Sequence, residues 1–199
     1  LFNNAGFGKA EKFEEMKSGD LEMMFKINVF AYLHLAQLVI PQMKKQGFGR
    51  IINVGSVVAF TPLPYFTNYN ATKSAIYMFN RSLRYELKDF NVKSTVVLPA
   101  RMKTGFADNA YDCYAKHGRT ECVEKFNKIA GSPYQVAKVI LKNMKKGKEV
   151  ITPTFKAKIW YLMRYFGFVV DLIMKNVLGP KELRTIIKAE HSEKVEKKI

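Results

Sequence analysis

Hydrophobic and polar positions along the chain alternate between helical and extended periodicity. Apolar residues recur at the spacing of one helix face in three segments: residues 21–45, residues 66–88, and the segment from Ser132-Pro133 to about Lys146. Short β-branched runs predict three buried strands, at residues 50–55, 92–98 and 149–152. Leu1-Phe2 is typical of the end of a further strand. Because strands that alternate with helices form parallel β-α-β units, the pattern predicts an α/β fold with a doubly wound parallel sheet.

Boundary signals refine the first of these helices. Asp20 is a predicted N-cap, Pro41 is the only interruption, and Gly47 follows the predicted end. Residues 103–130 are polar and mixed, which predicts a helical excursion with little core. Cys113 and Cys122 lie in this excursion and are interpreted as free thiols.

The last part of the chain opens with a strongly apolar stretch. Residues 159–178 predict one helix, whose narrow polar stripe consists of Arg164, Gly167, Asp171 and Lys175, and a charged helical tail follows from Lys181. Two charges within residues 159–174, Arg164 and Asp171, argue against a transmembrane span. The apolar face is therefore predicted to lie in a membrane interface, to cover an apolar substrate pocket, or to contact a second copy. The membrane interpretation draws on the preceding lysines, which are Lys142, Lys145, Lys146, Lys148, Lys156 and Lys158.

Composition narrows the class of protein. With 199 residues, 48% of them hydrophobic, the chain is not a disordered polymer. It divides into a predicted α/β unit at residues 1–152 and an apolar, basic extension at residues 153–199. Two cysteines are too few for a disulfide framework or a four-cysteine zinc site, and three scattered histidines lack metal-ligand spacing, so no metal site is predicted. This cysteine usage predicts a cytoplasmic protein. The apolar, basic extension adds the prediction of a peripheral place on a membrane.

The net charge of +16 is unevenly distributed. Residues 1–100 carry a net +5 and residues 101–199 a net +11. An excess of this size suits nucleic acid, an anionic membrane surface or an anionic ligand. Basic residues are not interleaved with aromatic ones, and no helix-turn-helix pattern occurs, so nucleic acid is not expected as a partner.

The candidate chemistry centres on Tyr69-Asn70-Ala71-Thr72-Lys73. Positions i and i+4 share a helix face, so the ammonium can lower the tyrosine pKa from about 10 and make the phenol a general acid–base group. Ser56 ends a predicted strand, where ligands bind in open α/β sheets. Tyr134 and Lys138 repeat the spacing without such a companion and are interpreted as surface residues. A Ser, Tyr and Lys set without a metal suits carbonyl reduction with hydride from a nicotinamide.

In these residues the chain resembles the short-chain dehydrogenase/reductase family. Five features match the family in type, order and spacing: the strand-end Ser56, the pair Tyr69 and Lys73, the turn Asn3-Asn4-Ala5-Gly6, the helix residue Asn28, and the loop from Pro99 to Thr104. Ala100 departs from the family, which has glycine there, and its methyl group alters the contact between loop and cofactor. The resemblance covers residues 1–152.

The resemblance implies a Rossmann-like sheet and an oxidoreductase that transfers hydride between NAD(P)(H) and a carbonyl or alcohol, with NADP slightly favoured. It implies that Ser56 polarises the substrate oxygen and that Tyr69 passes the proton. Lys73 would hold the cofactor ribose and lower the pKa of Tyr69, and Asn28 would help to order a relay water. The residues implied to contact the cofactor are Asn3, Ala5, Gly6, Tyr69, Lys73, Pro99, Ala100 and Thr104. Apolar residues near the expected pocket favour a hydrophobic, lipid-like substrate, and a homo-oligomer is a further expectation.

One family feature has no counterpart in the 199 residues. The Gly-x-x-x-Gly-x-Gly phosphate turn and the β-α-β portion around it would precede Leu1, so a fragment is predicted. Because that turn binds pyrophosphate at a helix N-terminus, we expect the 199 residues expressed alone to be inactive or unfolded. The alternative function is a truncated, non-catalytic protein that binds a partner or a membrane. The coding sequence upstream of Leu1 distinguishes the two.

Overall fold

The computed structural model describes residues 1–110, 128 and 130–173. Within them, four strands form one sheet in the order β1-β2-β3-β4: β1 at Phe2–Asn3, β2 at Gly49–Val54, β3 at Val92–Val97 and β4 at Val150–Ile151. All neighbouring pairs are parallel. In the register, Val97 lies beside both Val54 and Ile151, so the strands end at one common edge. The predicted parallel α/β sheet is confirmed.

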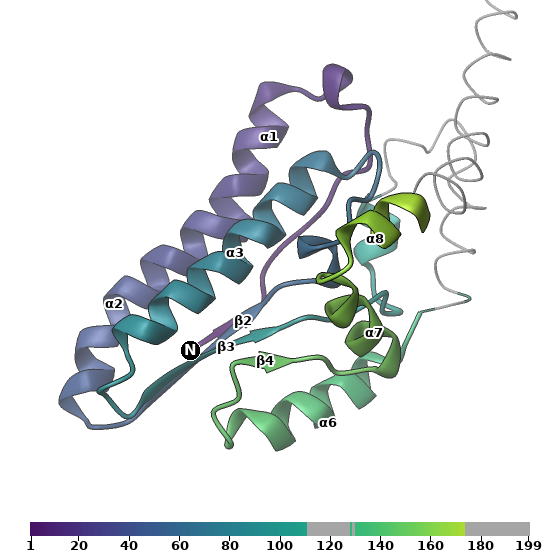
Figure 1. Ribbon diagram of the computed structural model, residues 1–199. Coiled ribbons are helices and arrows are strands. Elements are labelled where there is room, and N and C mark those ends of the chain that lie inside the picture. The colour runs from purple at the N-terminus through teal and green to yellow at the C-terminus, as the bar shows by residue number, and fades with distance from the viewer. Residues whose placement is uncertain (111–127, 129, 174–199) are drawn as a thin grey trace, which may run out of the picture.

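Helices cover both faces of this sheet (Figure 1). One face carries a continuous rod and a second helix: α1 (Ser18–Phe25), a π-helical turn (Lys26–Phe30), α2 (Ala31–Lys45) and, beside them, α3 (Thr67–Glu86). The opposite face carries α6 (Pro133–Met144). Successive strand residues point to opposite faces, so Ile51 packs with Leu83 of α3 while Ile52 packs with Val136 of α6. The sheet is doubly wound, as predicted.

The N-cap prediction for Asp20 is wrong. Helix α1 begins at Ser18, with Lys17 at the N-cap, so Asp20 lies inside the first turn. Its carboxylate there accepts a hydrogen bond from Lys9 Nζ at 2.7 Å and faces the positive end of the helix dipole. The acidic residue therefore marked the start of the helix to within three residues.

The single helix predicted over residues 159–178 is also wrong. Helix α7 (Phe155–Met163) ends, and α8 (Gly167–Ile173) begins after a turn. In that turn Phe166 donates its N–H to the carbonyl of Met163, three residues back, and the Arg164 guanidinium packs 3.6 Å from the Tyr161 ring centre. The backbone hydrogen bond between residues three apart, together with this stacking, ends the helix at the turn. The residues of the predicted polar stripe therefore do not share one helix. Lys175, the tail from Lys181, and both cysteines lie outside the described residues.

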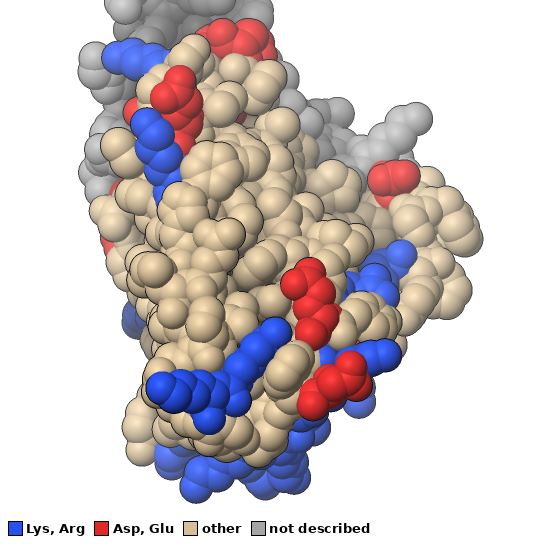
Figure 2. Space-filling model, turned by 90° about the vertical axis from the view of Figure 1, so that its left-hand side faces the viewer, with Lys and Arg blue, Asp and Glu red and all other residues tan. Residues whose placement is uncertain are grey.

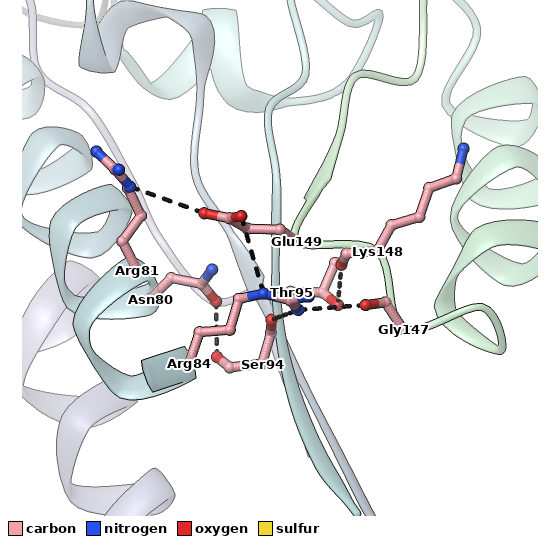
Figure 3. Close-up of polar contacts among 8 residues, drawn as sticks. All are labelled: Asn80, Arg81, Arg84, Ser94, Thr95, Gly147, Lys148 and Glu149. Carbon is pink, nitrogen blue, oxygen red and sulfur yellow. Dashed lines mark hydrogen bonds and ion pairs between the residues drawn. The ribbon is translucent and has the colours of Figure 1, made fainter. Parts of the chain in front are cut away.

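A polar network fastens the start of β4 to α3 and β3 (Figure 3). Arg84 donates from one nitrogen to the carbonyls of Ser94 and Gly147, each at 3.2 Å. Thr95 Oγ1 donates to the Lys148 carbonyl at 2.7 Å, and Glu149 lies 3.8 Å from Arg84 Nε. These contacts join segments about 60 residues apart in the chain. They hold β4 at the edge of the sheet, between α6 and α7 in the chain.

One stretch of helix, among the described residues, is long and apolar enough to cross a membrane. It runs from Ser18 to Lys45, and its most apolar window has a mean hydropathy of 1.5. Tyr32 and Ala36, each 1% exposed, pack this rod against the rest of the fold. Only 28% of that window is buried, so packing on the sheet accounts for one side of the rod and leaves other apolar side chains exposed.

Candidate active site

Several loops meet beyond the carboxyl ends of the strands. The main chain joins two of them: Gly55 donates to the Val97 carbonyl at 2.8 Å, and Val57 donates to the Pro99 carbonyl at 3.2 Å. Ser56 lies between these two bonds. The turn after β1 leaves Ala5 and Gly6 exposed at the same edge. In open α/β sheets this edge is where ligands bind.

Lys73 reaches this edge from α3 as a buried ammonium. The residue is 3% exposed, and its Nζ donates to the Val54 carbonyl at 2.9 Å. Burial disfavours the charged form and lowers the pKa of Lys73 to about 8. An ammonium has three N–H donors, and the described residues supply one acceptor, so the others are available to a ligand.

Tyr69 lies one helical turn before Lys73, with the Ser56 side chain near enough to its phenol to influence its pKa. Its ring packs 6.0 Å from that of Phe66 and 5.3 Å from that of Phe106. Burial among these groups raises the pKa of the phenol above its ordinary value, and the nearby Ser56 hydroxyl lowers it only in part. The expected net decrease of this pKa is therefore wrong, because desolvation by burial is the largest influence on it. The phenol carries its proton at neutral pH, as a proton donor requires.

Ser56 begins a short turn at the end of β2. Its Oγ accepts a hydrogen bond from the Val58 N–H at 3.3 Å, which opens the 3₁₀ turn Val57–Ala59. The residue is 9% exposed. This capping bond leaves the hydroxyl proton free of the main chain and directed by Tyr69 or a ligand, so Ser56 can donate to a carbonyl oxygen.

Asn28 anchors the loop after β1 from within the π-helical turn. Its Oδ1 accepts from the Phe7 N–H at 3.0 Å, and its Nδ2 donates to the Phe7 carbonyl at 2.8 Å and to Thr72 Oγ1 at 3.2 Å. The side chain is fully buried. Asn28 thereby links three segments around Lys73, and its predicted role in ordering a relay water stays a prediction.

We expect Asn28→Ala to lower the free energy of unfolding by about 2–3 kcal/mol, because the polar groups of Phe7 and Thr72 lose their buried partner. Urea denaturation followed by circular dichroism measures the change. Asn4→Ala is the matched control, because Asn4 is exposed in the same loop. Equal midpoints for the two variants would contradict the anchoring role.

The structure separates the predicted cofactor residues into two groups. Ala5 and Gly6 are exposed, with Gly6 beside Lys73, while Thr104 is exposed and its Oγ1 accepts from the Phe106 N–H at 3.3 Å. The side chain of Asn3 is instead buried, donating to Asn53 Oδ1 at 2.9 Å, so only its main chain remains for a ligand. Pro99 is buried, and Ala100, in the position where the resemblance expects glycine, is half-buried against the apolar cluster around Val57 and Tyr77.

Sequence reasoning missed a buried row of amides beside the site. Asn53 Nδ2 donates to Asn80 Oδ1 at 3.2 Å, and Ser94 Oγ donates to the same oxygen at 2.7 Å. An asparagine inside the β-branched run of β2 was the available signal, since such strands rarely bury an amide without a partner. The interpretation of Tyr134 as a surface residue is confirmed, because it is 67% exposed under Lys138 Nζ, 4.6 Å from its ring centre.

The residues at this edge fit the nicotinamide-ribose half of a dinucleotide. A Cβ placed on Gly6 would lie 3.0 Å from Asn28 Oδ1 and 3.4 Å from Lys73 Nζ, so glycine keeps a narrow space open beside the ammonium. Ribose hydroxyls are suitable acceptors for the free donors of Lys73. Among the strand–helix turns that the structure describes, none has the glycine-rich sequence that binds pyrophosphate.

Comparison with known proteins places this site in a family. A family model described as "short chain dehydrogenase" matches residues 1–114. The chain is 34% identical to 3-oxoacyl-[acyl-carrier-protein] reductase FabG of Aquifex aeolicus over 142 residues, covering 71% of this chain and 56% of that protein. It is 33% identical to 3-ketodihydrosphingosine reductase of Bacteroides thetaiotaomicron over 109 residues, covering 55% and 40%. An uncharacterized oxidoreductase, YusZ of Bacillus subtilis, is 31% identical over 153 residues, covering 70% and 54%. The chain thus spans roughly half the length of these relatives.

Solved structures share the fold. A short-chain dehydrogenase from Sphingobium yanoikuyae in complex with NADPH superposes with a TM-score of 0.70 at 24% identity, covering 89% of this chain and 65% of that one. A short-chain dehydrogenase/reductase from Burkholderia phymatum in complex with NAD gives a TM-score of 0.73 at 22% identity, covering 86% and 66%. The family model, which matches more than half of the residues of this chain, shows that the chain belongs to the short-chain dehydrogenase family.

Proposed function

We propose that the protein transfers hydride between NAD(P)(H) and a carbonyl or alcohol substrate by means of Ser56, Tyr69 and Lys73. One observation carries the proposal. A protonated phenol near a serine hydroxyl, and a buried ammonium without a counter-ion among the described residues, lie at the strand edge beside the open space at Gly6. Membership of the short-chain dehydrogenase family supports an oxidoreductase activity.

Each residue has a distinct task in the reductive direction. The bound nicotinamide supplies hydride to the carbonyl carbon, and the carbonyl oxygen takes the proton of the Tyr69 phenol. Ser56 donates a hydrogen bond to that oxygen and stabilises its developing negative charge. Lys73 binds the ribose and favours the phenolate that Tyr69 becomes. Solvent returns the proton to Tyr69, and oxidation of an alcohol reverses these steps.

A hydrophobic, lipid-like substrate follows from the surroundings of Tyr69. An apolar cluster borders its ring and contains Ala10, Leu63, Phe66, Phe106 and Ala110. Apolar lining favours a substrate whose chain beside the carbonyl is uncharged. Two relatives are named for reduction of a keto group on a 3-oxoacyl carrier protein and on 3-ketodihydrosphingosine, which supports the same substrate class here.

The direct test is an assay of the protein translated from its complete coding sequence. NADPH or NADH oxidation is followed at 340 nm with β-keto thioesters, long-chain ketones and short polar ketones. We expect turnover with the apolar carbonyls and a preference for NADPH. Tight cofactor binding without turnover of any carbonyl would favour the alternative, a non-catalytic binding protein.

A membrane surface is a further proposed partner of residues 153–173. Large apolar side chains on α7 and α8 are exposed, among them Phe155 (76%) and Phe168 (75%), and Lys156 and Lys158 lie beside them. By contrast, the other lysines of the membrane prediction, up to Lys148, come before β4 in the chain, whereas α7 comes after it. They therefore lie at the opposite end of that strand from α7. Interfacial aromatics with nearby lysines favour an anionic bilayer and hence a peripheral place in the cytoplasm. Sedimentation with anionic vesicles tests this, and an unbound protein would contradict it.

A homo-oligomer is proposed from the face formed by α1 and α2. Figure 2 shows there a broad uncharged surface between charged side chains at its upper and lower ends. Its exposed apolar residues include Met23, Phe30, Leu35 and Leu38, the last at 74% exposure. Apolar areas of this kind favour contact with another protein surface. Light scattering after size exclusion measures the mass, and a monomer at micromolar concentration would contradict the proposal.

A further inference from the structure

The ammonium of Lys73 is buried without a counter-ion. No carboxylate of the described residues lies within ion-pair distance, and the one hydrogen-bond acceptor among them is the Val54 carbonyl. A charge at 3% exposure with one hydrogen bond is expensive to keep. Other groups must therefore offset its loss of water.

Two aromatic rings face this ammonium from different helices. Nζ lies 5.6 Å from the ring centre of Tyr69 on α3 and 5.8 Å from that of Tyr32 on α2. Both distances fall within the ~6 Å at which the negative face of a ring attracts a cation. Tyr69 already belongs to the proposed catalytic set, whereas nothing in that set accounts for Tyr32.

Tyr32 is held firmly in this position. It is 1% exposed and packs with Val29 and Ile76, and its carbonyl accepts from Asn3 Nδ2 at 3.4 Å. One helical turn separates it from Asn28, so both side chains leave the rod on the side of Lys73. Its hydroxyl has no hydrogen-bond partner among the described residues. The ring face is therefore the part of Tyr32 that acts on Lys73.

We propose that Tyr32 is a positioning residue, whose ring keeps the Lys73 ammonium charged and beside the open space at Gly6. The inference rests on the proposed function for its consequence: with a neutral Lys73, the phenolate of Tyr69 is less favoured. Burial already brings the pKa of Lys73 to about 8. Loss of one cation–π contact would lower it by a further 0.5 to 1 unit, roughly, and leave much of Lys73 neutral near pH 7.

The titration of Lys73 can be measured directly in the resting protein. Groups face it from every neighbouring element: the Val54 carbonyl from β2, the Gly6 main chain, the Asn28 amide, and the phenols of Tyr69 and Tyr32. Burial raises the pKa of both phenols, so neither titrates near pH 8. A buried lysine that titrates there is thus Lys73, and its Cε resonance is assigned by its loss in Lys73→Met.

The experiment uses full-length protein with ¹³C-labelled lysine and compares three changes at Tyr32. Tyr32→Phe keeps the ring, Tyr32→Leu removes it, and pentafluorophenylalanine keeps the volume while reversing the charge of the ring face. We expect Phe to leave the Lys73 pKa in place, and Leu and pentafluorophenylalanine to lower it by about 0.5 to 1 unit. The fluorinated variant preserves packing, so it answers the question even where Tyr32→Leu does not fold.

Two results would overturn the inference. One is an unchanged Lys73 titration in the fluorinated variant, which removes the attraction of the ring. The other is an equal shift in Tyr32→Phe, which would transfer the effect to the hydroxyl. Neither measurement needs turnover, so the proposed reaction can fail while this inference stands. Where turnover is present, the alkaline limb of the kcat/KM profile should move to lower pH with the same variants.

Discussion

Tyr69→Phe is expected to lower kcat for carbonyl reduction about 10³-fold, the largest effect of any single change in this protein. The substitution removes the phenol proton, and a positioned acid of this kind contributes about 10²–10⁴-fold. Binding of NADPH should change little, because the ring and its contacts with Phe66 and Phe106 remain. Stopped-flow and steady-state assays in the full-length protein measure kcat, and fluorescence titration measures cofactor affinity.

Tyr134→Phe is the matched control for this experiment. Tyr134 has the same spacing to a lysine, but it is exposed on α6. Its removal should leave kcat unchanged. The role of Tyr69 as proton donor would be refuted by an activity within about tenfold of the parent, given a circular dichroism spectrum that matches.

Lys73→Met is expected to separate activity from stability. Activity should fall about 10²-fold, with a raised KM for the nicotinamide cofactor, because the ribose loses a buried donor and the phenolate loses its cation. The free energy of unfolding should at the same time lose the part of its pH dependence that comes from the titration of Lys73. Lys138→Met, at the second Tyr-x-x-x-Lys pair, is the control that should change neither.

The direction of the pH effect follows from the pKa of Lys73, about 8 in the folded protein against 10.5 for an ordinary lysine. Below pH 8 both states hold the proton, and burial of the charge costs its full amount. Between pH 8 and 10.5 the unfolded state binds more protons, so stability rises with pH. The free energy of unfolding should increase by about 2–3 kcal/mol from pH 8 to 10. Above pH 10 the buried Tyr32 and Tyr69 oppose this rise, because the unfolded phenols lose protons first.

Guanidinium denaturation between pH 7 and 10 tests the prediction. The parent and Lys138→Met should become more stable over this range, and Lys73→Met should not. A flat profile for the parent would mean that Lys73 keeps an ordinary pKa in the folded state. Lys73→Met gains stability because a buried charge is removed, but it also loses the hydrogen bond to the Val54 carbonyl, which offsets part of that gain. The decisive quantity is therefore the slope of the free energy of unfolding with pH.

The helices and strands could be predicted from the spacing of apolar residues, because that spacing is set by the local geometry of each element. Residues 50–55 and 92–98 were predicted as strands, and β2 and β3 lie within one residue of those bounds. The helix predicted over residues 66–88 is α3. Tyr69 and Lys73 could be paired from their spacing, since residues four apart on a helix share a face. The single apolar helix at residues 159–178 failed, because hydropathy does not record where a backbone turn such as that at Arg164 is stabilised.

By itself, then, the sequence determined the α/β class and the order of its elements, and it predicted Ser56, Tyr69 and Lys73 as the candidate catalytic set. The tertiary structure alone decided the electrostatics of that set. Phe106, 37 residues from Tyr69 in the chain, helps to desolvate the phenol and so turns the expected decrease of its pKa into an increase. Tyr32 meets Lys73 from another helix, and Asn3 turns its amide toward Asn53. Burial and long-range contact depend on how the elements pack, and no spacing along the chain encodes them.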